Sequence, residues 1–219
     1  MNNIVNEKKF IEAKLGINYS SLSQSYLRAE TSLTTNSVIN FNLQSASVAA
    51  PLVTEKLLNL NDVFCITHVS IGARFIAGTT LTTQKQLNAE VYSYADLNTG
   101  AFAAATEATL PNIASVWNSS LSWVINRREY VPALDCRSFL SVPTTQTAAN
   151  AYFTGSGIKT VNGWSSPFTG FLPFEPTVIS GRDTLNISVN LGASVIFTTA
   201  QTVYATMTVR GYLVTNAKS

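Results

Sequence analysis

The chain has 219 residues, which is enough to bury the core of one large domain. Its apolar fraction of 46% excludes a disordered polypeptide, and its charged fraction of 12% is about half the usual share for a soluble domain. The net charge is +2 and the basic residues are dispersed, so we do not expect strong nucleic-acid binding. The shortage of charge indicates a surface that is buried in an assembly or lies outside the cytosol. The alternative is a free β-domain kept soluble by hydroxyl and amide groups.

Residues 1–24 are expected to form a short helix or an arm in front of the main domain. Phe10, Ala13 and Ile17 recur near the helical period, and Gly16 is a stop signal. The stretch lacks the apolar run of a signal peptide, and no apolar run elsewhere reaches the about 18 residues that span a bilayer. We therefore expect a protein made in the cytoplasm and without a transmembrane segment.

Residues 25–219 are expected to form a single β-sandwich domain. The stretches with β character are, in chain order, SYLRAETSL, SVINFNL, DVFCITHVSIGARF, QLNAEVYSY, SSLSWVINRREYV, RSFLSVP, TLNISVNL, SVIFTT and QTVYATMTVRGYLV. TEKLLNL, after the second of them, could form a short helix. About eight strands with irregular connections predict an all-β fold of two packed antiparallel sheets.

DVFCITHVSIGARF is richest in β-forming residues and predicts a central strand, because both of its faces are apolar at the start. One predicted face carries Val63, Cys65, Thr67 and Val69, and the other carries Phe64, Ile66 and His68. In the final strand, Val203, Ala205, Met207, Val209 and Leu213 are expected to face the core.

The stretch TLNISVNL follows a turn signal at Ser180–Asp183, and in it polar and apolar residues alternate without exception. Leu185, Ile187, Val189 and Leu191 form its predicted core face, and Thr184, Asn186, Ser188 and Asn190 form a polar face without charge. Similar polar faces recur on SVINFNL and on the last strand. Thr, Asn and Ser can bond to a neighbouring molecule without the cost of burying charge. We expect this face to meet another chain, with open water as the alternative.

Residues 144–174 are interpreted as one long loop rich in aromatic side chains. Within it, Trp164 follows the turn dipeptide Asn162-Gly163. It could be an exposed aromatic platform of the kind that binds sugars, or a plug that seats the loop on the domain or on a neighbour. Trp123, by contrast, alternates with Leu121 and Ile125 and is expected in the core.

The sequence shows no pattern typical of an enzyme. His68 is the only histidine, and no serine stands in a nucleophile motif and no glycine-rich phosphate loop follows a strand. Cys65 and Cys136 lie far apart with no metal-ligand spacing, so two buried free thiols are expected. We predict no catalytic residues, no metal and no cofactor.

The stretches DVFCITHVSIG, SFLSVPTTQ and FEPTVISGRDTLNISVNL, with the polar N-terminal extension and the long aromatic loop, resemble virion proteins of bacteriophages that infect Bacteroidetes. The resemblance covers roughly residues 25–214 and implies a single jelly roll of about eight strands. It implies a capsid shell or capsid decoration protein that self-assembles in the virion, with itself and other virion proteins as partners. Residues 1–24 lack the Arg/Lys-rich arm of many small RNA virus coat proteins, so the genome would be held by other means.

A lectin-like or adhesin-like glycan-binding sandwich is the alternative function. The residues expected to contact a partner chain or a glycan are Trp164, Tyr152, Phe168, Tyr204 and Tyr212.

Overall fold

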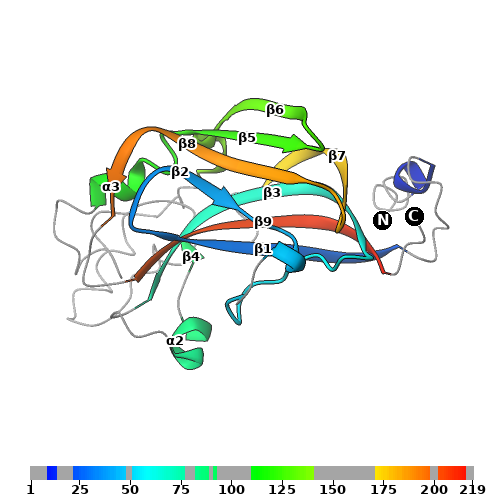
Figure 1. Ribbon diagram of the computed structural model, residues 1–219, viewed down its shortest axis with the longest axis horizontal. Coiled ribbons are helices and arrows are strands. Elements are labelled where there is room, and N and C mark those ends of the chain that lie inside the picture. Colours follow the sequence, from blue (N-terminus) through cyan, green and yellow to red (C-terminus); the bar gives the residue numbers. More distant parts are fainter. Residues whose placement is uncertain are drawn as a thin grey trace, which may run out of the picture.

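The strands of the computed structural model form two antiparallel sheets that pack face to face (Figure 1). The structure describes residues 9–13, 22–47, 51–76, 82–88, 91–92, 110–140, 171–197 and 202–215. The strands are β1 (Ser23–Leu33), β2 (Thr35–Phe41), β3 (Val63–Ile76), β4 (Val91–Tyr92), β5 (Ser120–Ile125), β6 (Arg128–Asp135), β7 (Leu172–Ser180), β8 (Leu185–Ile196) and β9 (Thr202–Val214). The short helices are η2 (Ser45–Ser47), α2 (Thr83–Asn88), α3 (Leu110–Ala114) and η4 (Cys136–Phe139), and residues 9–13 are helical as well.

The strand order identifies the topology. Sheet 1 has the order β1-β9-β3, with β7 and β4 both alongside β3, and sheet 2 has the order β2-β8-β5-β6. If the two-residue β4 is set aside, the first strand pairs with the last, the second with the seventh, the third with the sixth and the fourth with the fifth. The chain is thus one long antiparallel hairpin, wound so that β9 also pairs with β3 and β8 with β5. This is a jelly roll, as expected.

The core lies between the sheets, where the apolar sides of the alternating strands meet. The predicted inward residues of β8 and β9 are confirmed, since they belong to this core or pack against it: Leu185, Ile187, Val189, Leu191, Val203, Ala205, Met207, Val209 and Leu213. Trp123 of β5 is fully buried, also as predicted, and its ring centroid lies 5.4 Å from that of Phe174 on β7. This aromatic pair joins the two sheets.

Several element boundaries differ from the prediction. TLNISVNL and SVIFTT are one strand, β8, which continues through Gly192 at a φ of +75°. Strand β7 is absent from the predicted strands because Pro173 and Pro176 weaken its pattern. TEKLLNL is not helical: Lys56 and Leu58 form bridges to other segments instead.

The face assignment of β3 is wrong after Ile66. A β-bulge between Ile66 and His68 shifts the alternation by one residue, so Val69 joins Phe64 and Ile66 in the core and His68 points out of the sandwich. The sequence pattern gives no sign of the bulge, because both faces of this strand are rich in apolar residues.

The turn between β5 and β6 has two residues, Asn126 and Arg127, with φ values of 50° and 67°. Positive φ at both central positions defines the tight hairpin turn whose twist suits antiparallel strands. Asn is favourable in this conformation, whereas Arg has a Cβ that opposes it.

The turn after β7 is held by its neighbours, and Asp183 confirms the expected turn chemistry. The Asp183 carboxylate accepts hydrogen bonds from the Ser180 backbone N–H at 2.6 Å and from the Asn126 side-chain amide at 2.7 Å. At Gly181 an added Cβ would lie 2.0 Å from the Asn59 carbonyl oxygen, so only glycine fits there. The two hairpin turns at this end therefore support each other.

We expect Arg127→Gly to raise the free energy of unfolding by about 0.5–1 kcal/mol, because glycine removes the Cβ strain at positive φ and only part of this gain is offset by its greater freedom in the unfolded chain. Urea titration followed by circular dichroism measures the change. Arg127→Ala keeps the Cβ and is the control, and an equal gain with alanine would refute the backbone explanation.

Both cysteines, Cys65 and Cys136, are buried and free, as expected. Burial is the main cause that raises the pKa of the Cys136 thiol. We therefore expect Ellman's reagent to react with neither thiol of the folded protein at neutral pH and with two thiols per chain after denaturation without reductant. Rapid reaction of the folded protein would contradict the buried positions, and no reaction after denaturation would indicate a disulfide.

Candidate functional site

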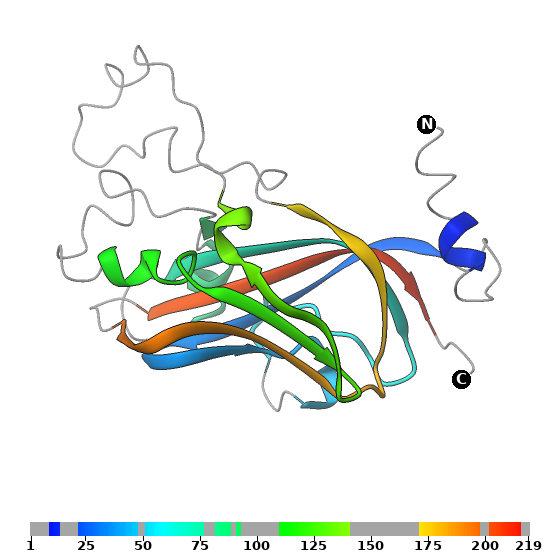
Figure 2. The ribbon, with the colours of Figure 1, turned by 90° about the horizontal axis from the view of Figure 1, so that it is seen from above.

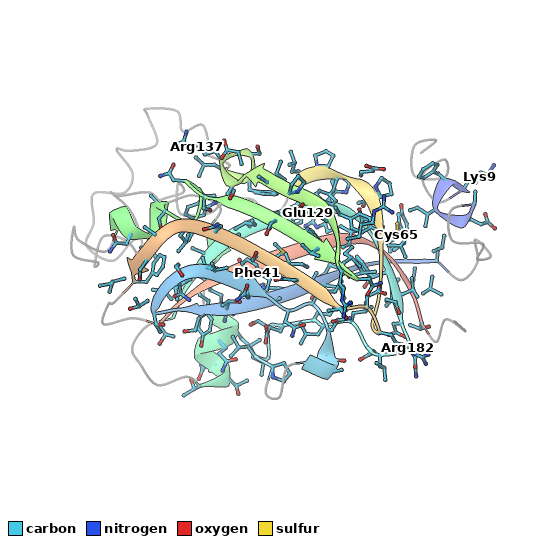
Figure 3. All side chains as sticks on the ribbon, turned by 45° about the horizontal axis from the view of Figure 1, so that its top comes forward. Lys9, Phe41, Cys65, Glu129, Arg137 and Arg182 are labelled. Carbon is cyan, nitrogen blue, oxygen red and sulfur yellow. The ribbon has the colours of Figure 1, made fainter. Side chains whose placement is uncertain are left out.

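The outer face of sheet 1 is covered at one end by the N-terminal segment. Ile11, in the helical residues 9–13, is fully buried and forms a small apolar cluster with Leu22, Cys65, Tyr212 and Val214. Figure 1 shows this helical segment beyond the ends of β1 and β9, and Lys9 of the same segment is labelled in Figure 3. The predicted contact residue Tyr212 is thus only 3% exposed and packs against the chain itself.

The other end of the outer face is covered by residues 51–58, called here the 51–58 segment, and by α2. Figure 1 shows α2 on the outer side of sheet 1. The side chain of Arg74 on β3 points into this layer and is fully buried. Its guanidinium donates to the Glu30 carboxylate on β1, to Thr54 Oγ1 at 2.6 Å and to the Gln86 backbone carbonyl of α2. One buried cation therefore joins sheet 1 to both covering elements.

Two further groups complete this buried ionic network. Arg28 Nε lies 3.0 Å from the Glu30 carboxylate, so Glu30 is shared between two guanidinium groups. The Glu55 carboxylate accepts from the backbone N–H groups of Glu30 at 2.8 Å and of Leu52 at 2.7 Å. Burial lowers the pKa of Arg28, although Glu30 opposes this shift. The two cations, Arg28 and Arg74, and the two anions, Glu30 and Glu55, of this network balance each other.

Tyr204, another predicted contact residue, lies under the same layer and is 6% exposed. Burial, followed by the negative charge of Glu30, raises the pKa of its phenol, which therefore stays neutral at physiological pH. The other three predicted contacts, Tyr152, Trp164 and Phe168, lie outside the described residues. The contact roles of all five stay predictions, and the structure leaves little surface on Tyr204 and Tyr212.

The 51–58 segment also covers part of one edge of the sandwich. The backbone of Lys56 exchanges hydrogen bonds with that of Arg28 on edge strand β1, at 2.8 and 3.0 Å. Leu58 then donates to the Leu43 carbonyl at 2.7 Å, just beyond the end of edge strand β2. The segment thus occupies backbone groups next to both edge strands on this side.

The opposite edge consists of β6 in sheet 2 and of β7 and the two-residue β4 in sheet 1, and β6 and β7 contain proline. Pro132 stands in β6, which is also bulged against β5, and Pro173 and Pro176 stand in β7. Proline cannot donate to a sheet ladder, so these positions weaken any extension of the sheets by another strand. Association through the strand edges is therefore obstructed in part on both sides.

Between its two covers, sheet 1 exposes a row that crosses β1, β9 and β3. In this row Tyr26 pairs with Arg210, and Arg210 pairs with His68. The Arg210 guanidinium stacks on the Phe171 ring at 3.9 Å, and His68 Nδ1 lies 2.9 Å from Thr67 Oγ1. His68 is half-buried and has no catalytic partner group around it among these residues.

The outer face of sheet 2 is different, because it is open and uncharged. Strands β2, β5 and β8 contain no Lys, Arg, Asp or Glu. Asn40, Asn186 and Asn190 are exposed on this face, and Ser122 and Ser188 meet at its centre with their hydroxyls 2.9 Å apart. In Figure 2, no helix or strand of the described chain lies across β2, β8 and β5. Among the described residues around this face, charge lies on the edge strand β6, for example Glu129, on η4, for example Arg137, and in the turns at one end of the sheet, for example Arg182 (Figure 3).

The polar face that the sequence shows on three strands is therefore buried on one strand and exposed on the other two. On β9 its members Tyr204, Thr206 and Tyr212 are buried by the chain's own segments. On β2 and β8 it stays exposed. Both faces alternate with apolar residues in the sequence, and the covering layers decide which of them is buried.

Within the described ranges, no group of three or more His, Cys, Asp or Glu side chains could hold a metal ion. In the same part of the chain, no helix is long and apolar enough to cross a membrane. The features that stand out chemically are two sheet faces, one covered and charge-neutralised and the other open and uncharged.

We expect Glu30→Gln to lower the free energy of unfolding by about 3 kcal/mol or more, because it leaves two buried or half-buried guanidinium groups without their anion. Urea denaturation measures the loss. Glu129→Gln, an exposed carboxylate on β6, is the control and should change stability by less than about 0.5 kcal/mol. Equal effects of the two variants would show that the buried network does not hold the covering layer.

Comparison with protein-family models, with curated proteins and with solved structures finds no match to this chain.

Proposed function

We propose that the protein is a virion structural protein, a capsid shell or capsid decoration subunit of a bacteriophage, and not an enzyme. Two lines of support come together. The resemblance of the sequence to phage virion proteins implies a jelly roll, and the strand order is that of a jelly roll. The fold alone is shared by unrelated functions, so the argument depends on the surface.

The observation that carries the proposal is the open, uncharged outer face of sheet 2. A free soluble domain usually keeps charge on its exposed strands, whereas β2, β5 and β8 have none. Removing such a face from water costs no desolvation of ions, and its Asn and Ser groups can bond to a neighbouring molecule. This is the surface of a subunit that packs against other subunits.

The mechanism is geometric. The edges of the sandwich are partly covered or carry proline, and its sheet 1 face lies under two covers. Association is left to the open face and to the loops at the ends of the strands. Symmetric repetition turns individually weak contacts into a stable shell. The partners are further copies of the chain and other virion proteins.

A glycan-binding function is the second candidate, because lectins share the jelly-roll topology. Here aromatic side chains such as Trp164 would bind sugar. A glycan array that compares the protein with Trp164→Ala distinguishes the two functions. Strong binding that the substitution abolishes would favour the lectin.

Purified protein should form oligomers or particles that grow with concentration, and particles should be visible by electron microscopy in extracts of the producing cells. Size-exclusion chromatography with light scattering gives the mass in solution. A protein that stays strictly monomeric at high concentration, with no particles in the cells, would rule out the virion function.

A further inference from the structure

The charged residues of the two sheets are distributed unequally. Each of the four long strands of sheet 1 contains at least one charged residue: Arg28 and Glu30 in β1, Arg74 in β3, Glu175 in β7 and Arg210 in β9. In sheet 2 only the outermost strand, β6, contains any. The neutral surface is therefore the whole outer face of β2, β8 and β5 and not an accident of one strand.

The side chains of this face form rows across the strands. In the central row, Ser188 of β8 is paired with Asn40 of β2 on one side and with Ser122 of β5 on the other. In the next row, Asn190 is paired in the same way with Val38 and Ser120. Hydroxyl and amide groups both donate and accept hydrogen bonds. Each of these rows can consequently bond to an identical row turned to face it.

We propose that the outer face of sheet 2 pairs with the same face of a second copy of the chain about a two-fold axis. The inference rests on the proposed function and identifies one of its subunit contacts. In a two-fold interface the same patch meets itself, so each charge in the patch approaches an equal charge of the other copy. A face without charge avoids this repulsion, and side chains that donate and accept equally are self-complementary.

The outer face of sheet 1 does not meet these conditions. Its open row carries Arg210, and two copies of this row turned to face each other would bring these like charges together. Its ends are already occupied by the N-terminal segment and by the 51–58 segment with α2. Of the two sheet faces in the described part of the chain, that of sheet 2 is the one that is exposed and uncharged.

The size of the face predicts a weak contact. Three strands about 4.8 Å apart and about seven residues of about 3.4 Å each give roughly 340 Å² per copy. A stable dimer usually buries about 800 Å² per partner. The pairing should therefore be measurable but concentration-dependent, as suits one of several contacts in a shell.

Variants that introduce a charge at the centre of the face test the proposal. Ser188→Glu and Ser188→Lys each place like charges opposite one another in the pair, and each should weaken self-association of the full chain at least about tenfold in sedimentation velocity. An equimolar mixture of the two variants should recover wild-type association, because opposite charges then meet. Ser32→Glu and Ser32→Lys place the same charges at an exposed position of β1 in sheet 1 and should leave association unchanged. Circular dichroism confirms that each variant is folded.

The outcomes separate this inference from the function on which it rests. If the wild-type protein assembles and the Ser188 variants assemble equally well, the two-fold pairing is wrong and the virion function stands. If each single variant fails and the mixture fails as well, the face meets a different partner, and the pairing is again wrong. If the wild-type protein is monomeric under all conditions, both the pairing and the proposed function are wrong.

Discussion

The position of β9 between β1 and β3 is the constraint on which the rest of the structure depends. β9 pairs with β1 along all eleven residues of that strand and with β3 from Val63 to Ile76 on its other side. Because the last strand lies between the first and the third, the strands between them must form a hairpin wound around the core. This winding places β2, β8, β5 and β6 in the opposite sheet and brings the apolar sides of both sheets together. It also makes β1 and β2 edge strands on one side.

The same winding explains why the two outer faces differ. The connection from β2 to β3 must pass from one sheet to the other, and it does so along the edge formed by β1 and β2. On the way it brings Thr54 and Glu55 over the outer face of sheet 1, where Arg74 and Glu30 already stand. The charges buried there are neutralised by opposite charges of the same chain, whereas a lone buried ion would destabilise the fold. Sheet 2 has no such connection across it in the described part of the chain, and its face carries hydroxyl and amide groups instead of ions.

The partly covered and proline-bearing edges, together with the uncharged face of sheet 2, are consistent with a protein that associates through faces and not through strand edges. A β-protein that assembles in many copies has to avoid uncontrolled pairing of its strand edges while still offering a contact surface. The 51–58 segment next to β1 and β2, with Pro132, Pro173 and Pro176 on the other side, obstructs the edges. Contacts between subunits then depend on faces and loops, whose side chains determine which partner surface fits them. This is the physical basis on which we propose a self-assembling subunit.

The sequence by itself determined the β-class, the inward positions of β8 and β9, the buried Trp123 and the two free thiols, because each depends on local alternation or on residue type. It did not predict β7, whose prolines hide the strand pattern, nor the bulge after Ile66 that turns His68 outward, since a strand with two apolar faces carries no register signal. It also did not reveal the network around Arg74, whose partners Glu30, Thr54 and Gln86 are far away in the chain. Only the tertiary structure decided which polar face is covered and which is open. β8 and β9 both alternate polar and apolar residues in the sequence, and burial of a polar face depends on the segment that the winding of the chain brings across it.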